Sequence, residues 1–183
     1  MSLTASAISR AGRTVVATGV LVVAIAGGAW PATTAASQST NELQVKAAFL
    51  FNFTRFVAWP PAGRPLAICI ARNAALTAAT AEIVGGRLVD GRPVEARALD
   101  IARGVDGCDL LYLADLKADD ASAALSRVRG PVLTVGETPR FLRDGGVVRI
   151  FVEDNRMRFQ VNRRQADLAG LKISSQLLSL ASQ

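Results

Sequence analysis

The sequence contains no histidine, only two cysteines and few aromatic residues. The first two shortages argue against particular kinds of catalytic and metal site. Histidine is the commonest general base and the commonest transition-metal ligand in proteins. Without it, and with only Cys69 and Cys108 to supply sulfur, a zinc site would need mostly carboxylate ligands. The composition therefore argues against a metalloprotein and, less strongly, against an enzyme.

The sequence also lacks the glycine patterns and basic runs that bind phosphate groups. Neither GxGxxG nor GxxxxGK[ST], the patterns of dinucleotide-binding and P-loop sites, occurs in it. The net charge is +6, but the basic residues are scattered, and no stacking aromatic residues lie between them. Binding of a nucleic acid, or of a nucleotide in such a loop, is therefore not indicated.

The first 36 residues show the three zones of a secretory signal peptide. Arg10 and Arg13 make the start basic, residues 15–30 are apolar or small, and small residues follow. The apolar run has about 16 residues, whereas a helix needs roughly 20 to span a bilayer. We expect cleavage after Ala36, or one residue earlier, and a single domain over residues 37–183. An uncleaved membrane anchor is the alternative.

The rest of the chain alternates between short apolar strands and helices. Strands are predicted at 65–71, 93–99, 108–114 and 131–135, helices at 73–84 and 119–128, and one helical turn at 139–143. Strands that alternate with helices form a parallel sheet covered by helices on its faces. The predicted fold class is therefore α/β: a three-layer sandwich with a largely parallel sheet flanked by helices and a C-terminal antiparallel hairpin at the sheet edge.

The hairpin and a last helix complete this prediction. Residues 147–153 and 156–162 alternate in polarity on either side of a two-residue turn, the pattern of a β-hairpin. An antiparallel edge of this kind is common on parallel sheets. Asn162 is suited to cap the last helix, which is predicted to reach about Ala181 and to bend near Gly170.

Residues 46–60, KAAFLFNFTRFVAWP, gather half of the aromatic residues of the chain into one predicted helix. The helix is predicted to begin at a capping box formed by Ser39 and Glu42, and to end near Val57 before two prolines. The aromatic residues of this segment are Phe49, Phe51, Phe53, Phe56 and Trp59. A helix with this many apolar residues is either buried in the domain or available to a partner.

Three of these phenylalanines are expected on one side of the helix. Phe49, Phe53 and Phe56 are spaced i, i+4 and i+7, and packing in the core accounts for such a stripe. Phe51 lies off the stripe, and Trp59 follows the helix. These two residues are the best candidates for a binding interface, because aromatic side chains are enriched in binding hot spots.

Cys69 and Cys108 are suited to form a disulfide. Cys69 lies in the first predicted strand and Cys108 opens the third, and such strands are often neighbours in a parallel sheet. An exported protein reaches a compartment that oxidises thiols, which favours one bridge between two cysteines. Two buried free thiols are the alternative.

The predicted C-terminal helix is basic on one side. Arg163, Arg164 and Lys172 supply these basic side chains. A solvated face accounts for these charges, and a contact with an acidic partner is the alternative. No internal repeat or low-complexity segment lies in residues 37–183.

Several segments in a fixed order resemble the YfiR-like family of periplasmic proteins. They are VKAAFLFNFTRFVAWP, PLAICIA, GRPVEARAL, CDLLYLA, PVLTVGE, FLRDGGVVRIFVEDNRMRFQVN and AGLKISSQLLSLA. The resemblance covers residues 45–181, and the GRPV, LTVGE, GG-hairpin and GLKISSQLL segments together are specific.

The resemblance implies a periplasmic regulator that is often dimeric and is not an enzyme. Such proteins bind the periplasmic domain of an inner-membrane diguanylate cyclase and repress it, which keeps cyclic di-GMP and biofilm formation low. We expect no cofactor and no nucleic-acid partner. The resemblance places Cys69 and Cys108 at a disulfide of the family. Some relatives have a second cysteine pair, but this chain has no cysteine after Cys108. The alternative function is a periplasmic sensor or carrier of a small molecule.

Overall fold

The computed structural model describes residues 33–182. Residues 1–32, and with them almost all of the predicted signal peptide, lie outside the described residues. Within the described part of the chain, no helix is long and apolar enough to cross a membrane. From Thr33 onward the chain forms one unit.

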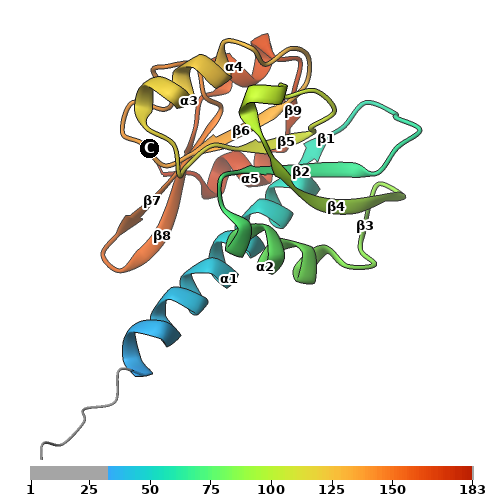
Figure 1. Cartoon of the computed structure of the whole chain (residues 1–183). Coiled ribbons are helices and arrows are strands. Elements are labelled where there is room, and N and C mark those ends of the chain that lie inside the picture. Colours follow the sequence, from blue (N-terminus) through green and yellow to red (C-terminus); the bar gives the residue numbers. More distant parts are fainter. Residues whose placement is uncertain (1–32, 183) are drawn as a thin grey trace, which may run out of the picture. The chain divides into compact units, whose positions relative to one another are not determined.

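A seven-stranded sheet, in the order β3-β4-β2-β5-β6-β7-β8, forms the centre of this unit (Figure 1). Its strands are β2 (Leu66–Ala71), β3 (Leu88–Val89), β4 (Arg92–Leu99), β5 (Leu110–Tyr112), β6 (Leu133–Gly136), β7 (Val148–Glu153) and β8 (Arg156–Val161). The five inner strands are parallel, and β3 and β8 lie antiparallel at the two edges. The predicted α/β fold with an antiparallel hairpin at the sheet edge is therefore confirmed.

Alternate residues of the inner strands face two separate cores. In β2, Leu66, Ile68 and Ile70 join the core that contains α1 (Thr33–Arg55), α2 (Ala74–Val84) and α5 (Ser175–Leu180). Ala67, Cys69 and Ala71 join the core on the other face, under α3 (Ala118–Leu125). Because β2 is buried on both faces, its sequence is continuously apolar rather than alternating.

The β7–β8 hairpin has the predicted two-residue turn. Asp154 and Asn155 have φ angles of 50° and 57°, as a type I′ turn requires, and Glu153 pairs with Arg156. A second tight hairpin, which was not predicted, joins β3 to β4 through Asp90 and Gly91 (φ 50° and 76°).

The predicted start of α1 is wrong, and its predicted end, near Val57, lies two residues beyond the observed one. Ser39 lies inside the helix rather than capping it, because the described part of α1 begins at Thr33. Glu42 does not close a capping box, and its carboxylate lies 2.9 Å from Lys46 Nζ one turn later. The helix ends at Arg55, since the next residues form β1 (Val57–Ala58), which pairs with a strand near the C-terminus.

The single bent helix predicted after Asn162 is also wrong. The chain forms α4 (Arg163–Leu168), β9 (Lys172–Ile173) and α5 instead. Gly170 ends α4 with a φ of 72°, and the N–H of the next residue bonds to the carbonyl of Ala166, as in a Schellman motif. The strand β9 is antiparallel to β1, so the C-terminal segment returns to the end of α1.

Phe141 fills the space between two glycines. The helical turn predicted at 139–143 is a run of turns, and it places the Phe141 ring, 1% exposed, in the core under α3. A Cβ atom on Gly136 would lie 2.3 Å from this ring, and one on Gly146 would lie 2.2 Å from it. Both glycines are therefore required for the close approach of the ring to the backbone.

Candidate functional site

The aromatic side chains of α1 pack against β8. The ring centre of Phe53 lies 5.2 Å from that of Phe159, and the ring of Phe49 lies 5.8 Å and 6.1 Å from Phe53 and Phe159, all edge-to-face. Phe53 is buried, whereas Phe49 and Phe56 are only partly buried at the margin of the core. The predicted stripe thus packs on the core, and two of its three rings remain partly accessible.

Phe51 does not lie on this accessible side. It is 6% exposed in the core shared with α2, and the guanidinium group of Arg87 lies over its ring at 5.1 Å. The expectation that Phe51 is surplus to the core is therefore wrong. A second helix, α2, covers the other side of α1, so aromatic residues on two sides of α1 serve the core.

An apolar groove of about 420 Å³ lies between α1, β8 and α5. Its lining residues are Phe49, Asn52, Phe53, Phe56, Met157, Arg158, Phe159, Leu177 and Leu180. We call it the aromatic groove. Leu180, at the rim of this groove, is 63% exposed. An exposed apolar hollow rimmed by polar residues is typical of a protein-binding surface.

The sequence indicated only the α1 side of the aromatic groove. Met157 and Phe159 alternate along β8 toward the groove, and Leu177 and Leu180 are spaced i, i+3 on α5. Both periodicities are visible in the sequence. The missing information was that β8 and α5 lie beside α1, which depends on contacts far apart along the chain.

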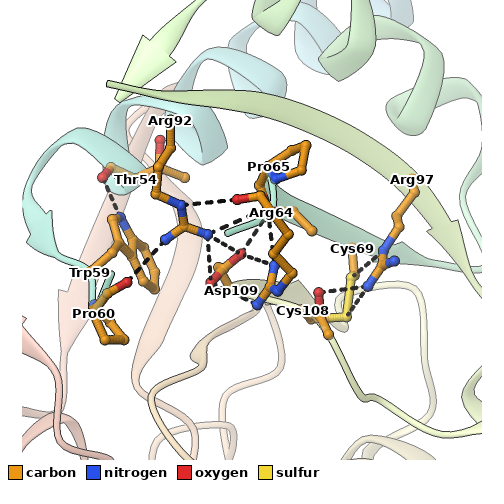
Figure 2. Close-up of polar contacts among 12 residues, drawn as sticks. Thr54, Trp59, Pro60, Arg64, Pro65, Cys69, Arg92, Arg97, Cys108 and Asp109 are labelled. Atoms are coloured by element: carbon orange, nitrogen blue, oxygen red, sulfur yellow. Dashed lines mark hydrogen bonds and ion pairs between the residues drawn. A yellow bond between two sulfur atoms is a disulfide. The ribbon is translucent and has the colours of Figure 1, made fainter. Parts of the chain in front are cut away.

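Trp59 is held against the end of α1. Its Nε1–H donates to the carbonyl of Thr54 at 2.8 Å, and its ring packs at the margin of the main core (Figure 2). Trp59 directly follows β1, whose Ala58 is the register partner of Lys172. Trp59 is therefore close to the C-terminal segment but does not line the aromatic groove.

Asp109 ties three segments together at the start of the parallel strands (Figure 2). Its side chain is 6% exposed and accepts two hydrogen bonds from Arg64, at 2.6 and 3.1 Å, and one from the Ala67 N–H at 2.8 Å. Arg92 reaches the same carboxylate at 3.3 Å and also donates to the carbonyl of Pro60 at 3.4 Å. This cluster fixes the loop that follows Trp59.

Cys69 and Cys108 form a disulfide, with a Cα–Cα distance of 5.8 Å. The predicted pairing is present because β2 and β5 are neighbours in the sheet. Arg97 covers the bridge: its Nε–H donates to Cys69 Sγ at 3.3 Å and its Nη2 to the carbonyl of Gly107 at 2.7 Å (Figure 2). Both sulfurs are buried, so the bridge is part of the core under α3.

We expect Cys69→Ser to lower the free energy of unfolding by about 2–5 kcal/mol, the usual loss for a small exported domain. The bridge closes a loop between residues 39 positions apart, which restricts the unfolded chain. Urea unfolding with and without a reductant measures the effect. The reductant should destabilise the parent and leave the variant unchanged. Two free thiols titrated in the denatured, unreduced parent would contradict the bridge.

A partly buried polar network attaches α1 to the sheet. Lys46 Nζ lies 2.9 Å from Glu137, which follows β6, and Glu137 also accepts a hydrogen bond from the hydroxyl of Tyr112 in β5. Burial, reinforced by the Glu137 carboxylate, raises the pKa of Tyr112 far above its usual range, so the hydroxyl stays a donor. Burial also disfavours the charged form of Lys46, but Glu137 and Glu42 outweigh this effect, and the pKa of Lys46 is raised.

The three basic residues of the C-terminal segment lie on two different elements. Arg163 and Arg164 open α4, Lys172 lies in β9, and all three side chains are exposed. They do not share one helix face, so the predicted single basic face is wrong. Its premise was a continuous helix, and Gly170 interrupts that helix.

The described residues offer no group of three or more histidine, cysteine or carboxylate side chains that could hold a metal ion. Asp115, which follows β5, accepts a hydrogen bond from Asn73 at 2.5 Å, and Asp120 lies 3.7 Å from Arg72. These carboxylates thus have structural partners.

The chain matches a known protein family. A family model described as YfiR/HmsC-like matches residues 43–182, from the second part of α1 to the tail after α5. The match includes every element that builds the aromatic groove, the Asp109 cluster and the disulfide. No curated protein matches the chain.

Proposed function

Because the chain belongs to the YfiR/HmsC-like family, we propose that it binds the periplasmic domain of an inner-membrane diguanylate cyclase and represses that cyclase. At the family level these proteins are periplasmic regulators of diguanylate cyclases. The disulfide fits an oxidising compartment. Repression lowers cyclic di-GMP and, with it, biofilm formation.

The aromatic groove is the observation that supports this proposal. A regulator that acts without chemistry must bind one state of its target better than another, and it needs a surface with enough differential affinity. The groove offers Phe49, Phe56, Met157 and Leu180 at an exposed margin. Buried aromatic and apolar anchors of this kind carry most of the free energy of binding in protein interfaces.

The way the groove is built also affects the affinity expected for the cyclase domain. It is built from both ends of the domain, α1 and α5, on the edge strand β8, and the disulfide lies in the opposite core. The cyclase domain would bind to a surface already held in shape by the sheet. Little ordering is then required on binding, which favours affinity.

We expect Leu180→Asp to abolish repression without unfolding the protein. Leu180 is 63% exposed, so the free protein tolerates a carboxylate, whereas an apolar interface would bury it unpaired. The loss of affinity should be at least about thirtyfold, as for a hot-spot residue. Cyclic di-GMP is measured in cells that co-express the protein with a membrane diguanylate cyclase that the parent represses.

Leu168→Asp is the matched control. Leu168 is a leucine on α4 that is 71% exposed, and it does not line the aromatic groove. It should repress like the parent, and melting temperatures should confirm that both variants are folded. If Leu180→Asp also represses like the parent, the cyclase binds elsewhere. If the parent represses none of the cyclases tested, the proposed function itself is wrong.

A further inference from the structure

The strand β8 forms one edge of the seven-stranded sheet, and residues of this strand line the aromatic groove. Asn162 N–H donates to the carbonyl of Val147, and the register pairs Val161 with Val148. Hydrogen-bonded pairs alternate along an antiparallel ladder. The backbone groups of Met157, Phe159 and Val161 therefore point away from β7, toward the open side of the sheet.

One of these outward groups already has a partner from an extended segment. The N–H of Ser182, which follows α5, donates to the carbonyl of Phe159 at 2.8 Å. Within residues 33–182, the other outward groups of Met157, Phe159 and Val161 have no backbone partner. Unpaired edge groups are a template for an additional strand, and a helix laid in the groove would leave them unpaired.

Side chains along β8 give this edge a chemical preference. Met157, Arg158 and Phe159 line the aromatic groove, and Arg156 and Arg158 alternate with the two apolar residues along the strand. Arg156 is exposed, and Arg158 is 44% exposed with its Nε 3.8 Å from Glu153. Residues opposite each other on neighbouring strands share a face, so apolar residues would meet the groove and acidic residues would meet the arginines.

We propose that the outer edge of β8 binds an extended segment of the partner as an additional antiparallel or parallel strand, with apolar and acidic residues in alternation. The proposal rests on the proposed function, because the partner is the periplasmic domain of the repressed cyclase. The incoming strand would replace the single hydrogen bond from Ser182 and would place its apolar side chains in the aromatic groove. Main-chain hydrogen bonds would give affinity, and the groove would give specificity.

Amide hydrogen exchange tests this mode of binding directly. With the purified periplasmic domain of the repressed cyclase, the N–H groups of Met157, Phe159 and Val161 should exchange at least about tenfold more slowly in the complex than in the free protein. The N–H groups of Arg156 and Arg158, which face β7, should change less. A complex that forms without added protection at Met157, Phe159 and Val161 overturns the strand proposal and leaves the proposed function intact.

A pair of variants at Met157 separates the backbone from the side chain. Met157→Ala shortens the side chain and keeps the N–H, whereas Met157→Pro removes the N–H and places a ring on the open edge. Proline is tolerated on edge strands where the N–H faces outward, so both variants should fold. Met157→Pro should bind the cyclase domain about tenfold more weakly than Met157→Ala. Equal affinity of the two variants would exclude pairing at this residue.

A capped synthetic peptide of alternating valine and glutamate tests the edge without any cyclase. It should slow exchange of the same three N–H groups, and a peptide of alternating valine and lysine should do so less, because lysine would face Arg156 and Arg158. If no cyclase is repressed but the acidic peptide protects these groups, the proposed function fails and the strand-binding edge stands. If the acidic peptide gives no protection at a concentration that saturates other strand-binding domains, the proposal is wrong.

Discussion

Gly146→Ala is expected to lower the free energy of unfolding by about 3 kcal/mol or more, which is a large part of the 5–15 kcal/mol of a typical domain. The new methyl group would lie 2.2 Å from the Cδ1 and Cε1 atoms of Phe141. The ring is 1% exposed, and a Cβ atom on Gly136 would also lie 2.3 Å from it, so the backbone at both glycines lies close to the ring and leaves it little room to move. The cost comes from overpacking and not from the backbone angle of the glycine.

Urea unfolding measures this effect, and Gly63→Ala is the matched control. No atom lies within 4 Å of a Cβ built on Gly63, so that variant should unfold like the parent. Phe141→Leu in the Gly146→Ala background should recover part of the loss, because it removes the atoms that clash. Equal stability of Gly146→Ala and the parent would show that the ring is not confined between the two glycines.

Asp109→Ala is the other substitution with a large expected effect. It removes a carboxylate that accepts hydrogen bonds from Arg64, Arg92 and the N–H of Ala67, and it leaves Arg92, whose side chain is only 12% exposed, without its charge partner. Removing one member of a buried ion pair costs about 3–5 kcal/mol. We expect a loss of this size in urea unfolding, with the loop after Trp59 cut first in limited proteolysis.

An ion pair at the surface provides the control for the Asp109→Ala variant. Asp120 lies 3.7 Å from Arg72, and both side chains are more than half exposed. Solvent screens such a pair, so Asp120→Ala should cost at most about 1 kcal/mol. Similar losses for both variants would mean that burial does not strengthen the Asp109 cluster, and our account of how the loop is fixed would be wrong.

Much of the fold could be predicted from local patterns. The apolar run at β2, the alternation of β4 and the turn residues between β7 and β8 depend on neighbours in the sequence, and these elements lie where they were predicted. The family could also be predicted, since its segments occur in order along the chain. Local patterns succeed where burial on one or two faces imposes a period on the residues.

Most of the incorrect predictions have one cause: the structure there depends on contacts between segments that are distant in the sequence. The strands β1 and β9 have two residues each, too few for a periodic signal, and each exists because the other is beside it. For the same reason Phe51 was misplaced, since α2 gives α1 a second buried side. The β3–β4 hairpin is different: Asp90-Gly91 is a strong turn signal that the sequence contained, but the strand before it is too short to notice.

The candidate site was predictable only in part. Phe49, Phe53 and Phe56 were identified from their spacing, while the partners that make a groove of them come from β8 and α5. Gly136 of the LTVGE segment and Gly146 of the GG segment both bring backbone close to the ring of Phe141. Because that contact joins two segments, the local sequence of neither one could predict it.

The pairing of β1 with β9 has a consequence for the order in which the chain can fold. Val57 and Ile173 are register partners 116 positions apart (173 minus 57), and the carbonyl of Phe56 accepts a hydrogen bond from Ser174 at 2.8 Å. While the chain is being synthesised, the aromatic side of α1 emerges long before the residues of β9 and α5 that cover its end. Pairing between strands so far apart in the sequence forms slowly. Until β1 and β9 pair, the uncovered apolar surface is prone to aggregate. The segment that offers most apolar surface to a partner is therefore also the one that stays uncovered longest during synthesis.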